Sequence, residues 1–169
     1  VRTAVFGAGS LPVAESRNNL GSALFQSGEL DGAIVEIGGS LATRRALLRP
    51  THPLVMRCLS NLGFLQLRAG DVDAAVANLM ECAEGWDRSF GPEHPGRVSV
   101  IISLSQALRR QGKRDDALAW LERALEWQRS HQEAGSPAIA ATEANVGIVL
   151  VESGRDSEAR ATLERVLPV

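Results

Sequence analysis

Histidine and cysteine are the side chains of this sequence that could bind a metal or carry redox chemistry. The three histidines are His52, His94 and His131, and no two stand four residues apart, the spacing that places two ligands on one helix face. The two cysteines, Cys58 and Cys82, are too few for a disulfide framework. We therefore predict no metal and no other cofactor, interpret the histidines as linker and cap residues, and interpret the cysteines as buried thiols in a reducing cytoplasm.

A glycine motif near the start of the chain imitates a dinucleotide-binding loop. Gly7 and Gly9 have the correct spacing, but Pro12 stands where the third glycine is required. Ser-His-Asp, Cys-His and paired-carboxylate sets are absent from repeated positions in the sequence. These residues give no basis for catalysis, so we expect a protein that is not an enzyme.

The charge balance excludes two classes of partner. The 169 residues include 18 Lys and Arg against 20 Asp and Glu, a net charge of −2. This balance lacks the excess of positive charge that binds nucleic acid or anionic membranes. No apolar stretch approaches the roughly 20 residues that a membrane-spanning helix needs. We therefore expect neither nucleic acid nor a membrane as a partner.

Helix-breaking residues recur with a period of 42. Pro53, Pro95 and Pro137 are 42 residues apart, and the same spacing separates Gly28, Gly70, Gly112 and Gly154. The same register aligns Asn19, Asn61, Ser103 and Asn145, and then Ala33, Ala75, Ala117 and Ala159. Self-similarity of this period predicts a repeat array.

Each period contains the signals of two helices. Apolar residues recur every three or four positions before each glycine, which fits a left-handed helix cap, and again after it. We predict first helices (A) over 13–27, 54–69, 96–111 and 138–153, and second helices (B) over 30–48, 72–89, 114–132 and 156–168. Small residues at Gly21, Gly63, Ser105 and Gly147 stand twelve positions before the aligned alanines, which favours close antiparallel packing of A on B.

This pattern resembles the tetratricopeptide repeat. The resemblance rests on the blocks Asn18-Asn19-Leu20-Gly21 with Gly28, Ala33 and Ile37, and Asn61-Leu62-Gly63 with Gly70, Ala75 and Leu79. The 42-residue form, with His-Pro at 52–53 and 94–95, is similar to the repeats of kinesin light chain and of bacterial regulatory proteins. HEAT and armadillo arrays, which have similar periods, are the alternative. The resemblance implies an all-α, right-handed superhelical solenoid of antiparallel helix pairs.

The repeat register divides the chain into five segments. Residues 1–11 are expected to be the end of a preceding helix B with a linker, followed by repeats at 12–53, 54–95, 96–137 and an incomplete one at 138–169. We expect from this phase, and from the missing initial Met, that the sequence was cut from a longer array or a multidomain protein.

The resemblance also implies where a partner would bind, because the A helices of the family line a concave groove. Counting from the aligned leucines gives the predicted groove residues, which are Asn18, Asn19, Ser22, Gln26, Arg57, Asn61, Phe64, Arg68, Ser103, Gln106, Arg110 and Asn145. The row Asn19, Asn61, Ser103 and Asn145 could pair with the backbone of an extended ligand, or it could stabilise the helices. Both interpretations are open at this point.

The predicted groove is more basic than the chain. Four arginines (57, 68, 109 and 110) oppose Glu15 and Glu152, which is compatible with an acidic peptide, although solvated helix arginines are the simpler interpretation. The Lys and Asn that clamp a carboxyl terminus in chaperone-binding members are replaced, for example by Ser60 and Phe64. A chaperone-tail adaptor is therefore not expected.

We conclude from the sequence that the chain is a protein-protein interaction scaffold that binds a peptide or partner helix in the groove. One alternative is self-association through exposed array ends, where Val166 and Leu167 would lack a neighbour. The other is a regulatory segment of a larger bacterial signalling enzyme or transcription regulator. A bacterial source fits the composition, in which Lys113 is the only lysine.

Overall fold

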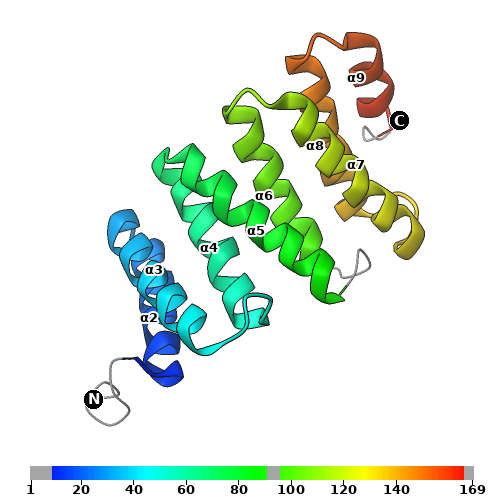
Figure 1. The fold of residues 1–169 in the computed structure, drawn as a ribbon. Coiled ribbons are helices and arrows are strands. Elements are labelled where there is room, and N and C mark those ends of the chain that lie inside the picture. Colours follow the sequence, from blue (N-terminus) through cyan, green and yellow to red (C-terminus); the bar gives the residue numbers. More distant parts are fainter. Residues whose placement is uncertain (1–8, 91–95, 166–169) are drawn as a thin grey trace. The chain divides into compact units, whose positions relative to one another are not determined.

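A computed structural model describes residues 9–90 and 96–165. It forms two compact units, residues 1–91 and 92–169, and each is described by itself. Figure 1 shows antiparallel helices in both units and, in the described residues, no strand. The helices of unit 1 are α2 (Leu11–Gln26), α3 (Leu30–Leu47), α4 (Pro53–Ala69) and α5 (Val72–Phe90). Those of unit 2 are α6 (Gly96–Arg110), α7 (Arg114–His131), α8 (Pro137–Glu152) and α9 (Asp156–Leu163).

Glycines end the A helices, as the sequence predicted. Gly28, Gly70, Gly112 and Gly154 have φ angles of 90°, 88°, 80° and 72°, the left-handed conformation that other residues avoid. The amide after each glycine donates to a carbonyl five residues earlier, as from Asp71 to Gln66 at 2.9 Å. The predicted helix ends are therefore confirmed to within two residues, except that α9 ends at Leu163 and a turn follows.

Small residues hold the A and B helices close together. A Cβ atom placed on Gly63 of α4 would lie 2.5 Å from Cγ of Leu79 and 3.3 Å from the carbonyl oxygen of Ala75, both on α5. The same contact joins Gly21 to Ile37 and Gly147 to Leu163. The predicted close packing of A on B is confirmed at these three positions.

Each unit is a stack in which one helix B lies between two A helices. In unit 1, α3 packs against both α2 and α4, and in unit 2, α7 packs against both α6 and α8. Two buried side chains make the same connection between successive pairs. Arg44 Nη1 donates to the Leu54 carbonyl at 3.0 Å, and Gln128 Nε2, two periods later, donates to the Ala138 carbonyl at 3.0 Å.

The end repeats carry charges where the middle repeats are apolar. Arg17 and Glu143 occupy the register position of Leu59 and Ile101. Arg17 Nε donates to Glu36 at 2.9 Å, and its guanidinium fills the space left by Gly39, where a Cβ would lie 2.1 Å from Cζ. Glu143 accepts from Arg129 at 2.7 Å. Both departures from the repeat pattern are thus paired inside their own units.

Several sequence expectations lie outside the described residues. They are the leader helix at Val1–Phe6, the linker residues His94 and Pro95, and the apolar residues Val166 and Leu167.

Candidate functional site

Four predicted groove residues meet at one pocket in unit 1. The pocket has a volume of about 220 Å³, and α2, α3 and α4 all contribute to its lining. Its walls are formed by Ser22, Phe25, Gln26, Ile37, Asn61, Phe64 and Leu65. The pocket is mainly apolar, with a few hydroxyl and amide groups beside it, which is the usual composition of a ligand-binding pocket.

Aromatic side chains join the two A helices at this pocket. The Phe25 ring of α2 meets the Phe64 ring of α4 edge to face, with centroids 5.7 Å apart and planes at 85°. Arg68, one turn beyond Phe64, places its guanidinium carbon 6.0 Å from the centre of the Phe64 ring. Phe64 is still 38% exposed, so the aromatic pair is accessible from solvent.

The row of polar residues divides into two groups. Asn19 and Asn61 have surface exposed, and no hydrogen bond is found for either amide within the described ranges. Ser103 Oγ donates to the Ser99 carbonyl at 3.2 Å, and Asn145 Nδ2 donates to the Ala141 carbonyl at 2.8 Å, each within its own helix. Asn19 and Asn61 are therefore free to meet a ligand backbone, whereas Ser103 and Asn145 already use a donor.

The prediction for Asn18 is wrong, because its side chain is only 6% exposed. Asn18 lies on the same helix face as Ala14 and Gly21, four residues before and three after it, and both are buried. Its Oδ1 accepts from the Cys58 thiol at 3.7 Å. Asn18 thus belongs to a buried polar cluster with Ser40, Arg44 and Cys58, in which Arg44 Nη1 contacts the Cys58 sulfur at 3.0 Å.

The remaining predicted residues are accessible but more scattered. Arg57 is exposed on α4, and Gln106 and Arg110 are exposed on α6 in unit 2. The structure therefore brings Ser22, Gln26, Asn61 and Phe64 together, with Arg68 beside them. Gln106, Arg110, Ser103 and Asn145 belong to the other unit and are treated separately from this pocket.

A two-point ion pair joins the A helices of unit 2. Arg109 of α6 donates from Nε and Nη2 to the two carboxylate oxygens of Glu152 of α8, at 2.9 and 2.5 Å. The hydrogen bonds from Arg109 hold the pKa of Glu152 below its ordinary value, and Glu152 raises the pKa of Arg109. The sequence showed both residues on the predicted groove but gave no sign that they neutralise each other.

The histidines and cysteines in the described part of the chain make contacts within the protein. His52 caps α4 by accepting at Nδ1 from the Leu54 amide at 3.1 Å, and His131 is the last residue of α7, with its ring stacked on Trp127. Both cysteines are buried and unpaired, as expected. Burial raises the pKa of the Cys82 thiol to about 12, so this thiol is protonated at neutral pH.

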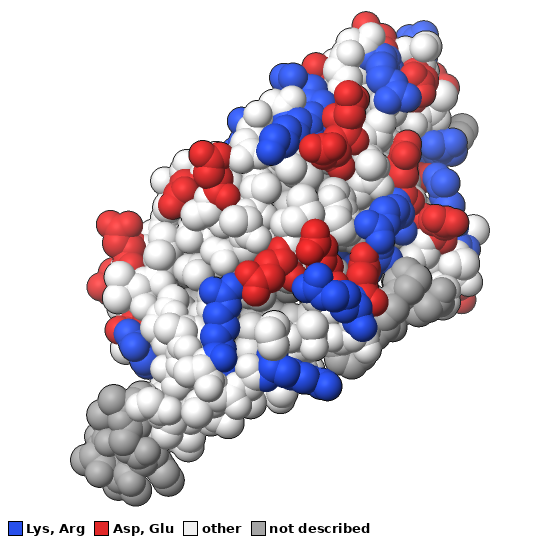
Figure 2. Space-filling view, viewed as in Figure 1, with Lys and Arg blue, Asp and Glu red and all other residues white. Residues whose placement is uncertain are grey.

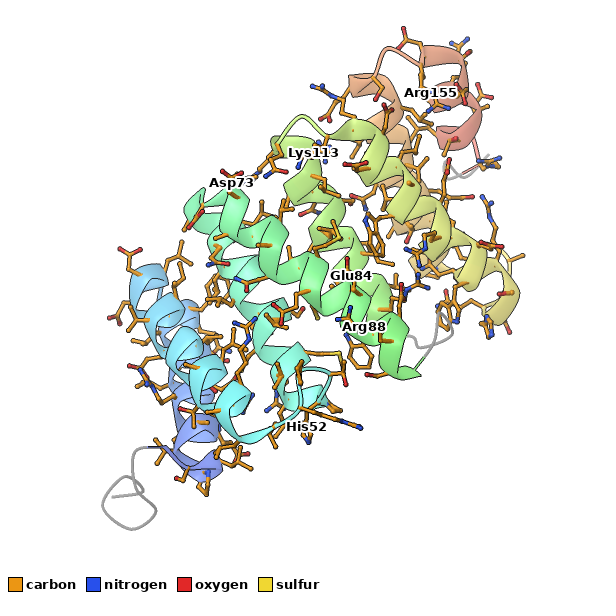
Figure 3. All side chains as sticks on the ribbon, in the orientation of Figure 1. His52, Asp73, Glu84, Arg88, Lys113 and Arg155 are labelled. Atoms are coloured by element: carbon orange, nitrogen blue, oxygen red, sulfur yellow. The ribbon has the colours of Figure 1, made fainter. Side chains whose placement is uncertain are left out.

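Charges on the molecular surface are mixed. Figure 2 shows acidic and basic side chains interspersed on the face that it presents, and Glu84 and Arg88, labelled in Figure 3, form one such pair on α5. Within residues 9–90 and 96–165, no three His, Cys, Asp or Glu side chains gather as they would around a metal ion. None of the described helices is long and apolar enough to cross a membrane.

Three pocket residues escaped the sequence analysis. Phe25, Ile37 and Leu65 were not among the predicted groove residues, although they form the apolar part of the lining. Ile37 is 2% exposed and Leu65 is 2% exposed, as expected of the helix core. Phe25 could have been found from the sequence, because it stands directly before the predicted groove residue Gln26. It is also one of only four phenylalanines in the chain.

Comparison with known proteins identifies the repeat family and the fold. The tetratricopeptide repeat family model matches residues 12–84 and 59–130, which together are more than half of the chain. No curated protein is significantly similar in sequence. Solved structures with the same fold include a putative kinesin light chain with nearly identical TPR-like repeats from Podosopora anserina, at 21% identity and a TM-score of 0.88. That match covers 98% of this chain and 78% of the other.

Two further solved structures share the fold. BtubC (BKLC) from P. vanneervenii is 20% identical, with a TM-score of 0.83 over 91% of this chain and 61% of the other. The MamA protein is 16% identical, with a TM-score of 0.69 over 91% of this chain and 71% of the other.

Proposed function

Because this chain belongs to the tetratricopeptide repeat family, whose members are generally protein-protein interaction scaffolds, we propose that it binds a peptide or partner helix through its A helices. The observation that carries the proposal is the pocket of unit 1, in which Ser22, Gln26, Asn61 and Phe64 lie together. A rigid, preformed surface lowers the ordering cost of binding on the protein side, so a flexible ligand supplies most of it.

The chemistry of this surface defines the ligand. The space between Phe25, Phe64 and Leu65 accepts an apolar side chain, while the Asn61 and Gln26 amides offer a donor and an acceptor to the ligand backbone. Arg57 and Arg68 are exposed on the same helix, α4, and favour acidic residues in the ligand. The proposed role is non-catalytic. Two buried unpaired thiols support a reducing, cytoplasmic compartment.

Selection from a random peptide library followed by point substitution tests this proposal. We expect Phe64→Ala to weaken binding of the selected peptide about fivefold or more, because truncating an aromatic anchor in a pocket costs more than about 1 kcal/mol. Val35→Ala is the matched control, since Val35 of α3 is another large apolar side chain, 63% exposed and outside the pocket lining. Equal affinities for Phe64→Ala and the unchanged chain would contradict the proposal.

One observation favours a second candidate function, self-association. Leu20 of α2 is 50% exposed, whereas Leu62, Leu104 and Val146 at the same register position are 7%, 0% and 6% exposed. A helix B from a second copy would bury Leu20 in the same manner. Val166 and Leu167, which were expected to promote association, lie outside the described residues.

A further inference from the structure

We propose that Arg109 is a second carboxylate-binding site of this protein, for an acidic side chain of a peptide partner, and that Glu152 occupies it in the absence of that partner. The proposal rests on the peptide-binding function above and adds a competing internal ligand to it. Arg109 and Glu152 come from α6 and α8, the two A helices of unit 2.

The geometry of Arg109 is that of a carboxylate-binding site that already holds a carboxylate. A guanidinium that donates from both Nε and Nη2 to one carboxylate makes the two-point contact by which arginine recognises carboxylates in general. The Arg109 side chain is 22% exposed and that of Glu152 is 34% exposed, so a carboxylate from solvent can reach the same donors. Ile148, one turn before Glu152 on α8, is 43% exposed.

The position of Glu152 makes it a displaceable occupant. It is the last residue of α8, where the negative end of the helix dipole disfavours a carboxylate. The turn at Ser153 and Gly154 follows it directly. Displacing Glu152 breaks only this partly exposed pair, and a partner carboxylate would take over both hydrogen bonds from Arg109.

The surroundings of Arg109 stay basic when Glu152 leaves. Arg114, at the start of α7, attracts the Glu152 carboxylate through charge. Arg110 and Lys113 are exposed nearby in the chain, and Figure 3 shows Lys113 in the turn between α6 and α7. An incoming acidic residue therefore meets the charge of Arg114 that now attracts Glu152.

Competition predicts the sign and size of the effect. A partly exposed ion pair contributes about 1 kcal/mol or less, which is equivalent to a change of about fivefold in affinity. Removing Glu152 should therefore strengthen binding of an acidic ligand by about fivefold, whereas the loss of a groove residue would weaken it.

The chain offers a matched control in the same unit. Arg155 makes the same two-point contact with Glu158, at 2.8 and 2.7 Å, on the exposed surface near α9. Glu158→Gln therefore removes one negative charge and one forked ion pair, as Glu152→Gln does, but leaves Arg109 occupied. Figure 3 shows Arg155 in the turn between α8 and α9.

The experiment measures the Kd of fluorescein-labelled hexaglutamate for the full chain by fluorescence anisotropy at low ionic strength. We expect Glu152→Gln to lower the Kd about fivefold and Glu158→Gln to change it by less than about twofold. The double variant Arg109→Gln with Glu152→Gln should not show this lower Kd, because it lacks the guanidinium that binds the carboxylate. An unchanged Kd for Glu152→Gln, or an equal gain from Glu158→Gln, would overturn the proposal.

The Arg109 site and the pocket of unit 1 can be tested separately. If Phe64→Ala weakens the library-selected peptide while Glu152→Gln leaves the hexaglutamate Kd unchanged, the pocket of unit 1 stands and the Arg109 site is excluded. If Glu152→Gln strengthens hexaglutamate binding while Phe64→Ala changes nothing, the Arg109 site stands and the pocket does not bind the peptide.

Discussion

Single glycines determine how closely the helices of each pair approach. At Gly63 a methyl group would lie 2.5 Å from Leu79 Cγ, which is closer than van der Waals contact allows. At Gly38, on α3, nothing lies within 4 Å of an added Cβ. The same residue type therefore has a packing role at one position and no packing role at the other.

This difference predicts opposite effects for one substitution. Gly63→Ala should lower the free energy of unfolding by about 1–3 kcal/mol, because the core around Leu79 must shift to admit the methyl group. Gly38→Ala should raise it by about 0.5–1 kcal/mol, because alanine is the better helix former. Urea denaturation of both variants measures these changes. A stabilised Gly63→Ala variant would contradict the packing described for α4 and α5.

The Cys82 thiol predicts how stability changes at alkaline pH. Burial raises its pKa from 9.0 to about 12, so the folded chain keeps a proton that the unfolded chain loses in this range. The resulting stabilisation is complete below pH 9.0 and is lost as the pH rises toward 12. The slope contributed by this thiol is up to about 1.4 kcal/mol per pH unit.

Comparison with Cys82→Ala isolates this effect. The variant has no thiol to titrate, so its free energy of unfolding should fall less steeply between pH 9 and pH 10.5 than that of the unchanged chain. Urea denaturation at several pH values gives both slopes. Parallel slopes would show that Cys82 ionises equally in the folded and unfolded states.

At the level of the helices, the B helices α3 and α7 are each tied to the A helix that follows by a buried donor. Arg44 of α3 and Gln128 of α7 are 1% and 0% exposed, and each donates to a backbone carbonyl in the first turn of the following helix. The two residues share a register position but differ in type. What the two residues share is a long polar side chain that ends in an N–H donor.

Substitution of Gln128 tests this connection. Gln128→Met keeps the volume but leaves the Ala138 carbonyl without its donor, which should lower the free energy of unfolding by about 1–3 kcal/mol. Gln106→Met is the matched control, because Gln106 is exposed on α6 and should change stability by no more than about 0.5 kcal/mol. Equal effects of the two substitutions in urea denaturation would exclude the connection.

The sequence predicted the elements more completely than the site. Helix ends follow from local chemistry, since a left-handed turn at Gly70 and a proline at the start of α4 act within a few residues. The family offsets place Asn18 on the groove, but Ala14 and Gly21 define a buried face of α2 that includes it. The pocket depends on Phe25 and Phe64 meeting from different helices, which spacing within one helix does not encode.

The Arg109–Glu152 pair shows the same limit. The two residues are 43 positions apart, one repeat plus one residue, which placed them on neighbouring A helices. Their rotamers, and thus the fork that joins them, depend on the packing of α6 and α8 in three dimensions.

At the scale of the whole molecule, Leu20 predicts the association state. If a second copy covers the α2 face, the mass measured by light scattering should rise with concentration, and Leu20→Glu should return it to the monomer value of 18.0 kDa. The substitution places a charge where a partner helix would need an apolar contact. A mass of one chain at every concentration would exclude self-association.

A map of the peptide on the protein surface tests binding through the A helices. Amide chemical shifts of the isotope-labelled chain, recorded with and without a library-selected peptide, report which residues the ligand contacts. We predict the largest changes at Ser22, Gln26, Asn61 and Phe64, around the pocket that α2 and α4 share. Changes confined to the outer side of α3 and α5, at Val35 and Ala77, would contradict binding through the A helices.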